Sequence, residues 1–183
     1  MDITGPYFST PRGNKYLLTI TDHFTKYAEV FSIVDQTAET CAKLYATQIV
    51  SRHGTGAQVI TEQGRAFISR FLQEICKVLW IRRTRTTSYH ATSNGMIERW
   101  HKDLHTGLSH YINSANTNWD TIVPFFFWMA HRATPHSVTG YSTYYLLHGR
   151  EMQLPSNDSL KARCVKENTS QDRRLENLKM AYT

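Results

Sequence analysis

The chain has 183 residues, 40% of them hydrophobic, which is enough to bury one substantial core and fits a single domain with a tail. Its 21 lysines and arginines against 15 acidic residues give a formal net charge of +6, which favours a polyanionic partner without proving one. The three cysteines form no Cys-x-x-Cys pair, which argues against a disulfide scaffold or zinc knuckle and predicts a reducing, intracellular compartment. No stretch is apolar enough for a membrane span and no signal-peptide pattern is present, so we expect neither membrane insertion nor secretion.

Strand and helix patterns alternate along the chain. Runs rich in β-branched and aromatic residues predict strands at 15–21, 27–34, 57–61 and 81–86. Helical periods predict helices at 37–53, 67–79, 95–113, 119–132 and 142–148. We expect Gly54 and Gly149 to end two of these helices, and Ile75 and Val78 to be buried. The mixed order is typical of an α/β domain.

Composition divides the chain near Pro155. The preceding residues carry all the strong strand and helix patterns, so we assign one domain to residues 1–155. Residues 156–183 are polar and are expected to be a partly helical tail or a linker.

Three acidic residues stand at the ends or edges of predicted elements. They are Asp2, Glu62 directly after the strand AQVIT, and Glu98 one turn into a helix. Three carboxylates brought together would supply the oxygen ligands that hard divalent ions need. Spacing alone leaves open the alternative that each acid is a solvated surface group, which is the usual state of acidic residues.

Three groups of local motifs surround these acids. The first group is DITGP at 2–6, GNKYLL at 13–18 and DHFTKY at 22–27. The second is TEQGRAF at 61–67, and the third is RTRTTSYH at 83–90, SNG at 93–95 and IER at 97–99. Together they resemble the integrase catalytic core of long-terminal-repeat retrotransposons, chiefly the gypsy-like class, and of retroviruses.

The resemblance implies an RNase H-like fold, a central mixed sheet flanked by helices, with Asp2, Glu62 and Glu98 as catalytic residues and metal ligands. Two Mg²⁺ or Mn²⁺ ions are the implied cofactors. The implied activity is that of an integrase-type polynucleotidyl transferase and endonuclease, which processes the 3′ ends of retroelement DNA and transfers them into target DNA. The implied partners are double-stranded DNA and further copies of the chain, and the implied location at the integration step is the nucleus. Against the family pattern, the first strand is expected to be truncated and the chain to be a polyprotein fragment.

The sequence departs from the family pattern at several positions. Glu62 stands where the family has Asp, and its extra methylene moves the carboxylate outward by about 1.5 Å. Misplacement of about 1 Å can cost ~10²-fold in rate, so we expect impaired integration. Ala91 and Thr92 replace a common Pro-Gln, His131 replaces a usual Tyr, and Thr143 replaces a common Pro.

Basic and aromatic residues lie around the third motif group. From Lys77 to Lys102 the chain has six basic residues and one acid, Glu98. We expect the following residues to bind DNA: Lys77, Arg82, Arg83, Arg85, Tyr89, His90, Arg99 and Lys102. The alternative is a solvated strand edge and helix face.

The sequence leaves two other functions open beside integration. A non-catalytic, integrase-derived module that binds DNA or protein is the main alternative, because Glu62 departs from the pattern. An RNase H-like nuclease acting on RNA shares the carboxylate chemistry but not these motifs. His101 and His105 have a zinc-compatible spacing, but no further Cys or His pair is nearby. The aromatic run 125–128 predicts either core or a subunit interface, and we expect a homo-oligomer.

Overall fold

The computed structural model describes residues 1–61, 70–85, 117–126 and 131–154. The chain divides into two compact units, one of residues 1–20 and 30–124, the other of residues 21–29 and 125–183. The expected helix at 95–113 and the tail at 156–183 lie outside the described residues. Among the described helices, none combines the length and the apolar character that crossing a membrane requires.

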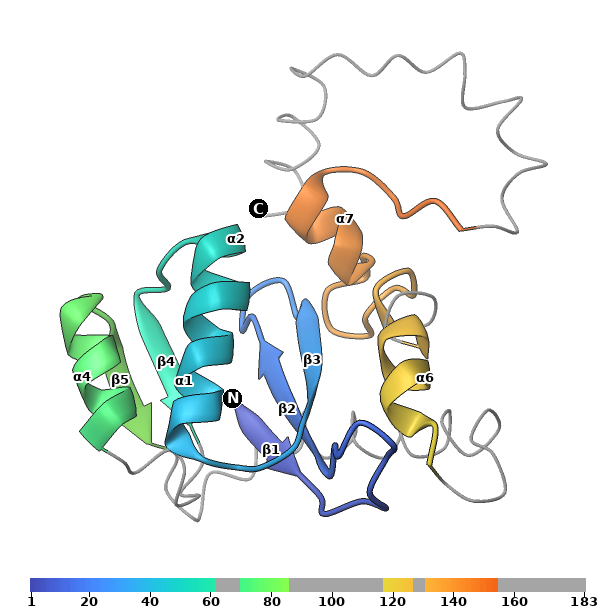
Figure 1. The fold of residues 1–183 in the computed structure, drawn as a ribbon. Helices are drawn as coiled ribbons and strands as arrows, with labels where there is room; N and C mark the ends of the chain where they lie inside the picture. The colour runs from blue at the N-terminus through green and yellow to red at the C-terminus, as the bar shows by residue number, and fades with distance from the viewer. Residues whose placement is uncertain (62–69, 86–116, 127–130, 155–183) are drawn as a thin grey trace. The chain divides into compact units, whose positions relative to one another are not determined.

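The first unit opens with a three-stranded sheet in the order β1-β2-β3 (Figure 1). Its strands are β1 (Asp2–Thr4), β2 (Tyr16–Thr21) and β3 (Ala28–Ile33). β1 runs antiparallel to β2, with Asp2 opposite Thr19 and Thr4 opposite Leu17. The expected strands at 15–21 and 27–34 are therefore confirmed.

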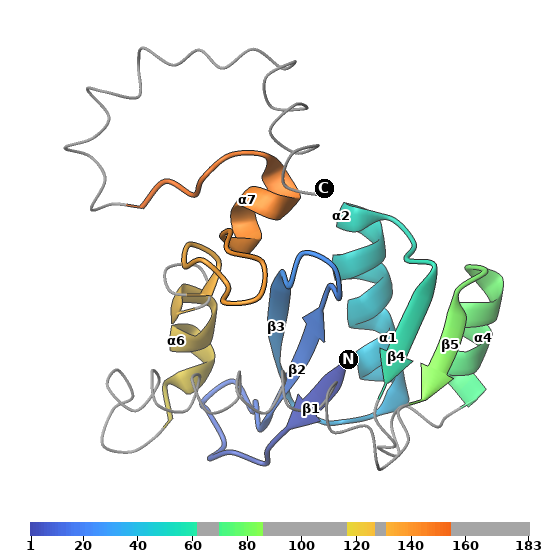
Figure 2. The same ribbon diagram turned by 180° about the vertical axis from the view of Figure 1, so that it is seen from behind.

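A parallel pair of strands follows, β4 (Gln58–Thr61) and β5 (Arg82–Arg85), connected through helix α4 (Arg70–Val78). One backbone contact joins this pair to the first sheet, because the nitrogen of Met1 donates to the carbonyl of Ile60 at 2.8 Å. β1 and β4 point in the same direction in both views (Figures 1 and 2). The two sheets therefore meet at β1 and β4.

A helical segment connects β3 to β4. It consists of α1 (Ala38–Leu44), a π-helical stretch η1 (Tyr45–Val50) and α2 (Ser51–His53). The hydroxyl of Thr37 caps its start by accepting from the backbone of Thr40, and Gly54, at φ 78°, follows its end. The expected helix at 37–53 and its glycine stop are confirmed.

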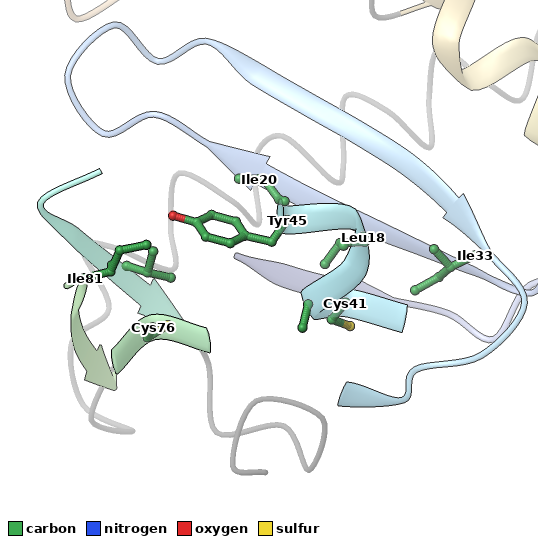
Figure 3. Close-up of a cluster of buried hydrophobic side chains, with 9 residues drawn as sticks. Leu18, Ile20, Ile33, Cys41, Tyr45, Cys76 and Ile81 are labelled. Atoms are coloured by element: carbon green, nitrogen blue, oxygen red, sulfur yellow. The ribbon is translucent and has the colours of Figure 1, made fainter. Parts of the chain in front are cut away.

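One hydrophobic core unites these elements (Figure 3). Its buried residues are Leu18, Ile20, Ile33, Cys41, Ala42, Tyr45, Val59, Cys76 and Ile81. They come from both sheets and from α1, η1 and α4, so a single apolar layer holds the two sheets together. The prediction that Val78 is buried is wrong, because its side chain is 72% exposed, whereas Cys76 is buried. In α4 Cys76 is buried and Ile75 is partly buried against the core, as is Leu79 just after the helix, whereas Val78 faces away from the core.

Helix α6 (Trp119–Phe126) begins within the first unit, and helix α7 (Thr143–His148) belongs to the second. The hydroxyl of Ser142 caps α7 by accepting from the backbone of Tyr145 at 3.0 Å, and it donates to Glu151 at 2.7 Å. Gly149 ends the helix in the left-handed region at φ 68°, as expected for the helix at 142–148. Thr143 is the first residue of this helix, a position that proline favours. The replacement of the family's common proline by threonine at this position therefore changes the structure little.

Candidate active site

Asp2 lies in β1 and its side chain is buried, with 7% exposure. Its Oδ1 accepts a hydrogen bond of 2.7 Å from the backbone of Ile3. Burying a carboxylate is costly unless donors or a cation compensate. The alternative that Asp2 is a solvated surface group is therefore wrong.

The end of β4 lies beside Asp2. The 2.8 Å contact between the Met1 nitrogen and the Ile60 carbonyl places residue 2 next to the last residues of β4. Thr61, the final residue of that strand, is almost fully buried. The chain thus passes from this edge directly into Glu62.

Glu62 and Glu98 lie outside the described residues, so the convergence of the three carboxylates stays a prediction. Within the described ranges, no cluster of three or more His, Cys, Asp or Glu is placed to hold a metal ion. Of the predicted ligands, the described ranges include Asp2. Its carboxylate oxygens are the donor type that Mg²⁺ prefers.

Tyr7 is a neighbour of Asp2 that the sequence motifs did not single out. Its pKa is raised above the ordinary value, first by burial and also by the negative charge of Asp2, while a hydrogen bond with Thr4 acts in the opposite direction. Its ring packs against that of Trp119, with centroids 5.2 Å apart. The Trp119 indole Nε1 donates to the carbonyl of Phe8 at 2.8 Å. The segment after β1 is therefore fixed to the start of α6.

Gly5 allows this segment to turn back closely on β2. Its φ is 127°, and a Cβ at this position would lie 2.7 Å from the carbonyl oxygen of Lys15. Two residues later, the backbone of Tyr7 donates to the same carbonyl at 2.7 Å. Only glycine fits this passage, which sets where Tyr7 stands relative to β1.

A second buried aspartate, Asp120 in the first turn of α6, has a different environment. Its Oδ2 accepts from the hydroxyl of Thr10 at 2.9 Å and from the amide of Asn14 at 2.8 Å. The exposed guanidinium of Arg12 lies 3.7 Å away. The backbone of Gly13 donates to the carbonyl of Thr10 at 2.8 Å, so this segment forms a turn, and Asp120 joins the turn to α6.

Of the described DNA-binding candidates, Lys77 lies in α4, and Arg82, Arg83 and Arg85 lie in β5. Side chains alternate along a strand, so Arg82 and Arg83 point to opposite faces. Arg83 lines a shallow depression together with Lys77, and Arg82 lies on the other face, where its neighbours Gln58 and Thr84 are hydrogen-bonded at 2.5 Å. Arg85 ends the strand, opposite Thr61. Tyr89, His90, Arg99 and Lys102 lie outside the described residues.

In the second unit, Arg132 contacts polar and aromatic groups at the start of β3. Its Nη2 lies 3.8 Å from the carboxylate of buried Glu29 and donates to the carbonyl of Ala28 at 3.4 Å. Its guanidinium carbon stands 4.6 Å from the centre of the Tyr27 ring. The Glu29 carboxylate is therefore paired with the Arg132 cation, and this pair supports the fold. His131, which departs from the family pattern, is the half-buried residue before Arg132.

Comparison with known proteins identifies the domain. The family model "Integrase core domain" matches residues 1–91. The retrovirus-related Pol polyprotein from transposon 412 of Drosophila melanogaster is 29% identical over 155 residues, which cover 85% of this chain and 12% of that protein. The Pol polyprotein of Radiation murine leukemia virus (strain Kaplan) is 29% identical over 135 residues, 73% of this chain and 23% of that protein. The chain thus spans only a small part of the length of these relatives.

Solved structures show the same fold. A chain of the simian T-cell lymphotropic virus intasome, determined in complex with the PP2A regulatory subunit B56 gamma, matches with a TM-score of 0.66 at 23% identity, covering 84% of this chain and 54% of that one. The HTLV-2 integrase catalytic core, determined with magnesium in a trimeric form, matches with a TM-score of 0.61 at 21% identity, covering 78% and 90%. The fold is therefore the RNase H-like fold of integrase cores, as expected. Residues 1–91 thus match the integrase core domain, and the chain has homologues among retrotransposon and retroviral Pol polyproteins.

Proposed function

We propose that this chain is the catalytic core of a retroelement integrase, in which Asp2, Glu62 and Glu98 hold two divalent ions, Mg²⁺ or Mn²⁺. The observation that carries the proposal is the 2.8 Å contact between Met1 and Ile60. It brings buried Asp2 to the edge at which the chain continues from Thr61 into Glu62. Carboxylate oxygens suit these hard ions, so the residues fit the implied metal.

The proposed reaction consists of two phosphoryl transfers at one site. In the first, a water oxygen attacks a phosphodiester near the end of the element's DNA, and the bond from phosphorus to the 3′ oxygen breaks. In the second, the freed 3′-hydroxyl attacks a phosphodiester of the target, forms a new phosphorus–oxygen bond and expels the target's 3′ oxygen. When bound, the ions activate the attacking oxygen and stabilise the leaving one.

The chain's own residues supply charge and position. The three carboxylates hold negative charge in a fixed arrangement, which is the role that burial of Asp2 within β1 serves. Basic side chains bind the phosphates of element and target DNA through a salt-dependent attraction. Among these, Lys77, Arg82, Arg83 and Arg85 belong to the described residues. Tyr89 and His90 are proposed to lie near the scissile end.

Glu62 supports a second candidate function, that of a non-catalytic module that binds DNA or protein. The longer side chain keeps the charge but displaces the carboxylate by about a bond length, ~1.5 Å. Displacement of this size is enough to lower the rate by ~10²-fold. In the catalytic proposal the copy is therefore impaired, and in the alternative it retains binding alone.

The proposed assembly is a homo-oligomer on double-stranded DNA, acting in the nucleus at the integration step. Phe125 in α6 is 56% exposed, although it belongs to a strongly apolar helix. An exposed aromatic ring in such a run fits a subunit interface. The solved HTLV-2 cores are described as trimeric and dimeric forms. A monomeric mass at tens of micromolar would count against self-association.

The catalytic proposal is tested with a strand-transfer assay on the element's own terminal DNA, in Mg²⁺ and in Mn²⁺. Glu62→Asp is expected to raise activity by up to about 10²-fold, because it retracts the carboxylate without changing its charge. Glu98→Gln in that background is expected to abolish activity, because it removes a negative ligand at nearly constant size. Glu39→Gln is the matched control, since Glu39 is an exposed acid on α1.

One outcome separates the two candidates. If Glu62→Asp stays at background while the protein is folded and bound to DNA, the catalytic proposal fails for this site and the non-catalytic module is favoured. Ala91, Thr92 and His131 would then be the first positions to restore to the family pattern.

DNA binding is tested separately by charge reversal. Changing Arg82, Arg83 and Arg85 to Glu is expected to weaken duplex binding and to flatten its salt dependence. Arg150→Glu serves as the control, since Arg150 is an exposed cation in the second unit. Unchanged affinity of the triple variant would assign these arginines a role in solubility alone.

A further inference from the structure

The turn between α4 and β5 holds an exposed tryptophan in a strained conformation. Trp80 is 94% exposed and has a φ of 55°. The turn is fixed by backbone hydrogen bonds from Trp80 to Lys77 at 3.1 Å and from Ile81 to Cys76 at 2.8 Å. A left-handed backbone is unfavourable for a residue other than glycine, and an exposed ring regains little of this cost by packing. Stability therefore does not explain a tryptophan at this position.

The surroundings of Trp80 are cationic. Residues 73–85 contain four cations, Lys77, Arg82, Arg83 and Arg85, against one acid, Glu74, and β4 beside them contains no acid. The side chains of Lys77 and Arg82 are exposed. An exposed aromatic ring among cations is complementary to a polyanion that carries flat aromatic groups.

A depression next to the turn adds polar groups suited to a phosphate. It has a volume of about 340 Å³ and is lined by Gln73, Cys76, Lys77, Ile81 and Arg83. Cys76 and Ile81 are buried and form its floor, so the amide, ammonium and guanidinium groups supply the polar lining. Its size is within the range of small-ligand sites.

We propose that this turn binds single-stranded nucleic acid, with an unpaired base stacked on Trp80 and adjacent phosphates held by Lys77 and Arg83. The proposal extends the DNA binding of the proposed function, but it concerns another end of the strands. Trp80 precedes the start of β5, whereas the candidate active edge adjoins Thr61, which is opposite Arg85 at the end of β5. A strand of four residues spans roughly 10–13 Å, so Trp80 lies apart from the candidate active edge.

The test measures binding of a labelled oligo(dT) of about 15 nucleotides and of a hairpin duplex, in EDTA and over a range of salt concentrations. Trp80→Gly removes the ring and relieves the backbone, so the variant is expected to be at least as stable as the parent. Its affinity for oligo(dT) is expected to fall about 5- to 100-fold, as loss of one stacked base implies, with duplex binding unchanged. Trp80→Phe should keep most of the affinity. Phe24→Ala, which removes a ring that is 62% exposed in the second unit, should keep all of it.

Lys77→Gln and Arg83→Gln are each expected to reduce the salt slope of oligo(dT) binding by about 0.7, the value for one phosphate contact on a single strand.

The proposal is overturned if the parent does not bind oligo(dT), or if Trp80→Gly binds oligo(dT) as tightly as the parent. It is overturned as well if Trp80→Gly lowers duplex affinity as much as oligo(dT) affinity. It is also overturned if an oligoglutamate peptide binds at Trp80 and oligo(dT) does not, which would indicate an acidic protein partner. Glu98→Gln should bind oligo(dT) normally, so failure of strand transfer and failure of this proposal give different results.

Discussion

Asp2 and Asp120 are both buried aspartates of the first unit, with 7% and 6% exposure, yet their surroundings differ. Asp120 receives hydrogen bonds from Thr10 and Asn14, far earlier in the chain, and has Arg12 beside it. Asp2 accepts from the backbone of the next residue and stands beside the end of β4. Burial alone therefore does not identify a functional acid.

A carboxylate whose donors come from distant segments contributes to holding those segments together. Removing Asp120 leaves the Thr10 hydroxyl and the Asn14 amide without their acceptor, which costs stability. Asp2 lies at a strand edge beside the end of β4, where the proposed function places a cation, so its removal should cost activity instead.

The largest expected effect is that of Asp2→Asn. In a Glu62→Asp background, strand transfer should fall by at least about 10²-fold, because the substitution removes a charged ligand at constant size. The free energy of unfolding should change by less than about 1 kcal/mol or rise, since a buried charge is removed. Strand-transfer assays and urea unfolding measure the two quantities. A large loss of stability would instead place Asp2 in the same structural class as Asp120.

Asp120→Ala is expected to have the opposite profile. The free energy of unfolding should fall by about 2–3 kcal/mol, because two donors lose a charged acceptor in a buried position. Arg12 contributes little to this loss, because its side chain is exposed. Arg12→Ala is therefore the matched control, with an expected loss below about 1 kcal/mol. Equal losses in the two variants, measured by urea unfolding, would contradict the assignment of the main role to Thr10 and Asn14.

Trp119→Phe tests the connection between the segment that follows β1 and the start of α6. The variant loses the hydrogen bond from the indole to the Phe8 carbonyl but keeps an aromatic ring next to Tyr7. The expected loss is about 1–2 kcal/mol, one hydrogen bond and some packing. Activity at a temperature where the variant is folded should change little. A fall in activity comparable to that of Asp2→Asn would show that α6 positions the active edge.

Periodic patterns predicted the regular elements well. The strands at 15–21, 27–34 and 57–61 and the helices at 37–53 and 142–148 form within a residue or two of their expected bounds. Asp2 was found by its resemblance to a family motif, because a single acid at a strand end has no periodicity of its own.

Features that depend on tertiary geometry could not be predicted from the sequence. Val78 was expected to be buried because it follows Ile75 by three residues, but α4 turns its Cys76 face inward. Arg82 and Arg83 were grouped because they are adjacent, and strand alternation places them on opposite faces. Tyr7 lies in a non-repeating segment, so its place beside Asp2 required the structure.

The smallest expected effect concerns the titration of Tyr7. Its pKa is raised by burial first and by the charge of Asp2 second. A tyrosine with a raised folded-state pKa contributes stability that is fully present below its ordinary pKa of about 10 and is lost as the pH rises through the folded value. Asp2→Asn removes only the smaller of the two causes, so the pKa of Tyr7 should fall but remain above the ordinary value.

The measurement is the ultraviolet absorbance of tyrosinate over an alkaline titration, with the curve of the corresponding Tyr7→Phe variant subtracted so that the other tyrosines cancel. In the Asp120→Asn variant the pKa of Tyr7 should stay where it is in the parent, since Asp120 is not among the causes of its shift. Equal falls in the Asp2 and Asp120 variants would mean that Tyr7 senses the general charge of this unit. A fall confined to Asp2→Asn would place the hydroxyl at the candidate active edge, because it would respond to the acid of β1 and not to the acid of α6.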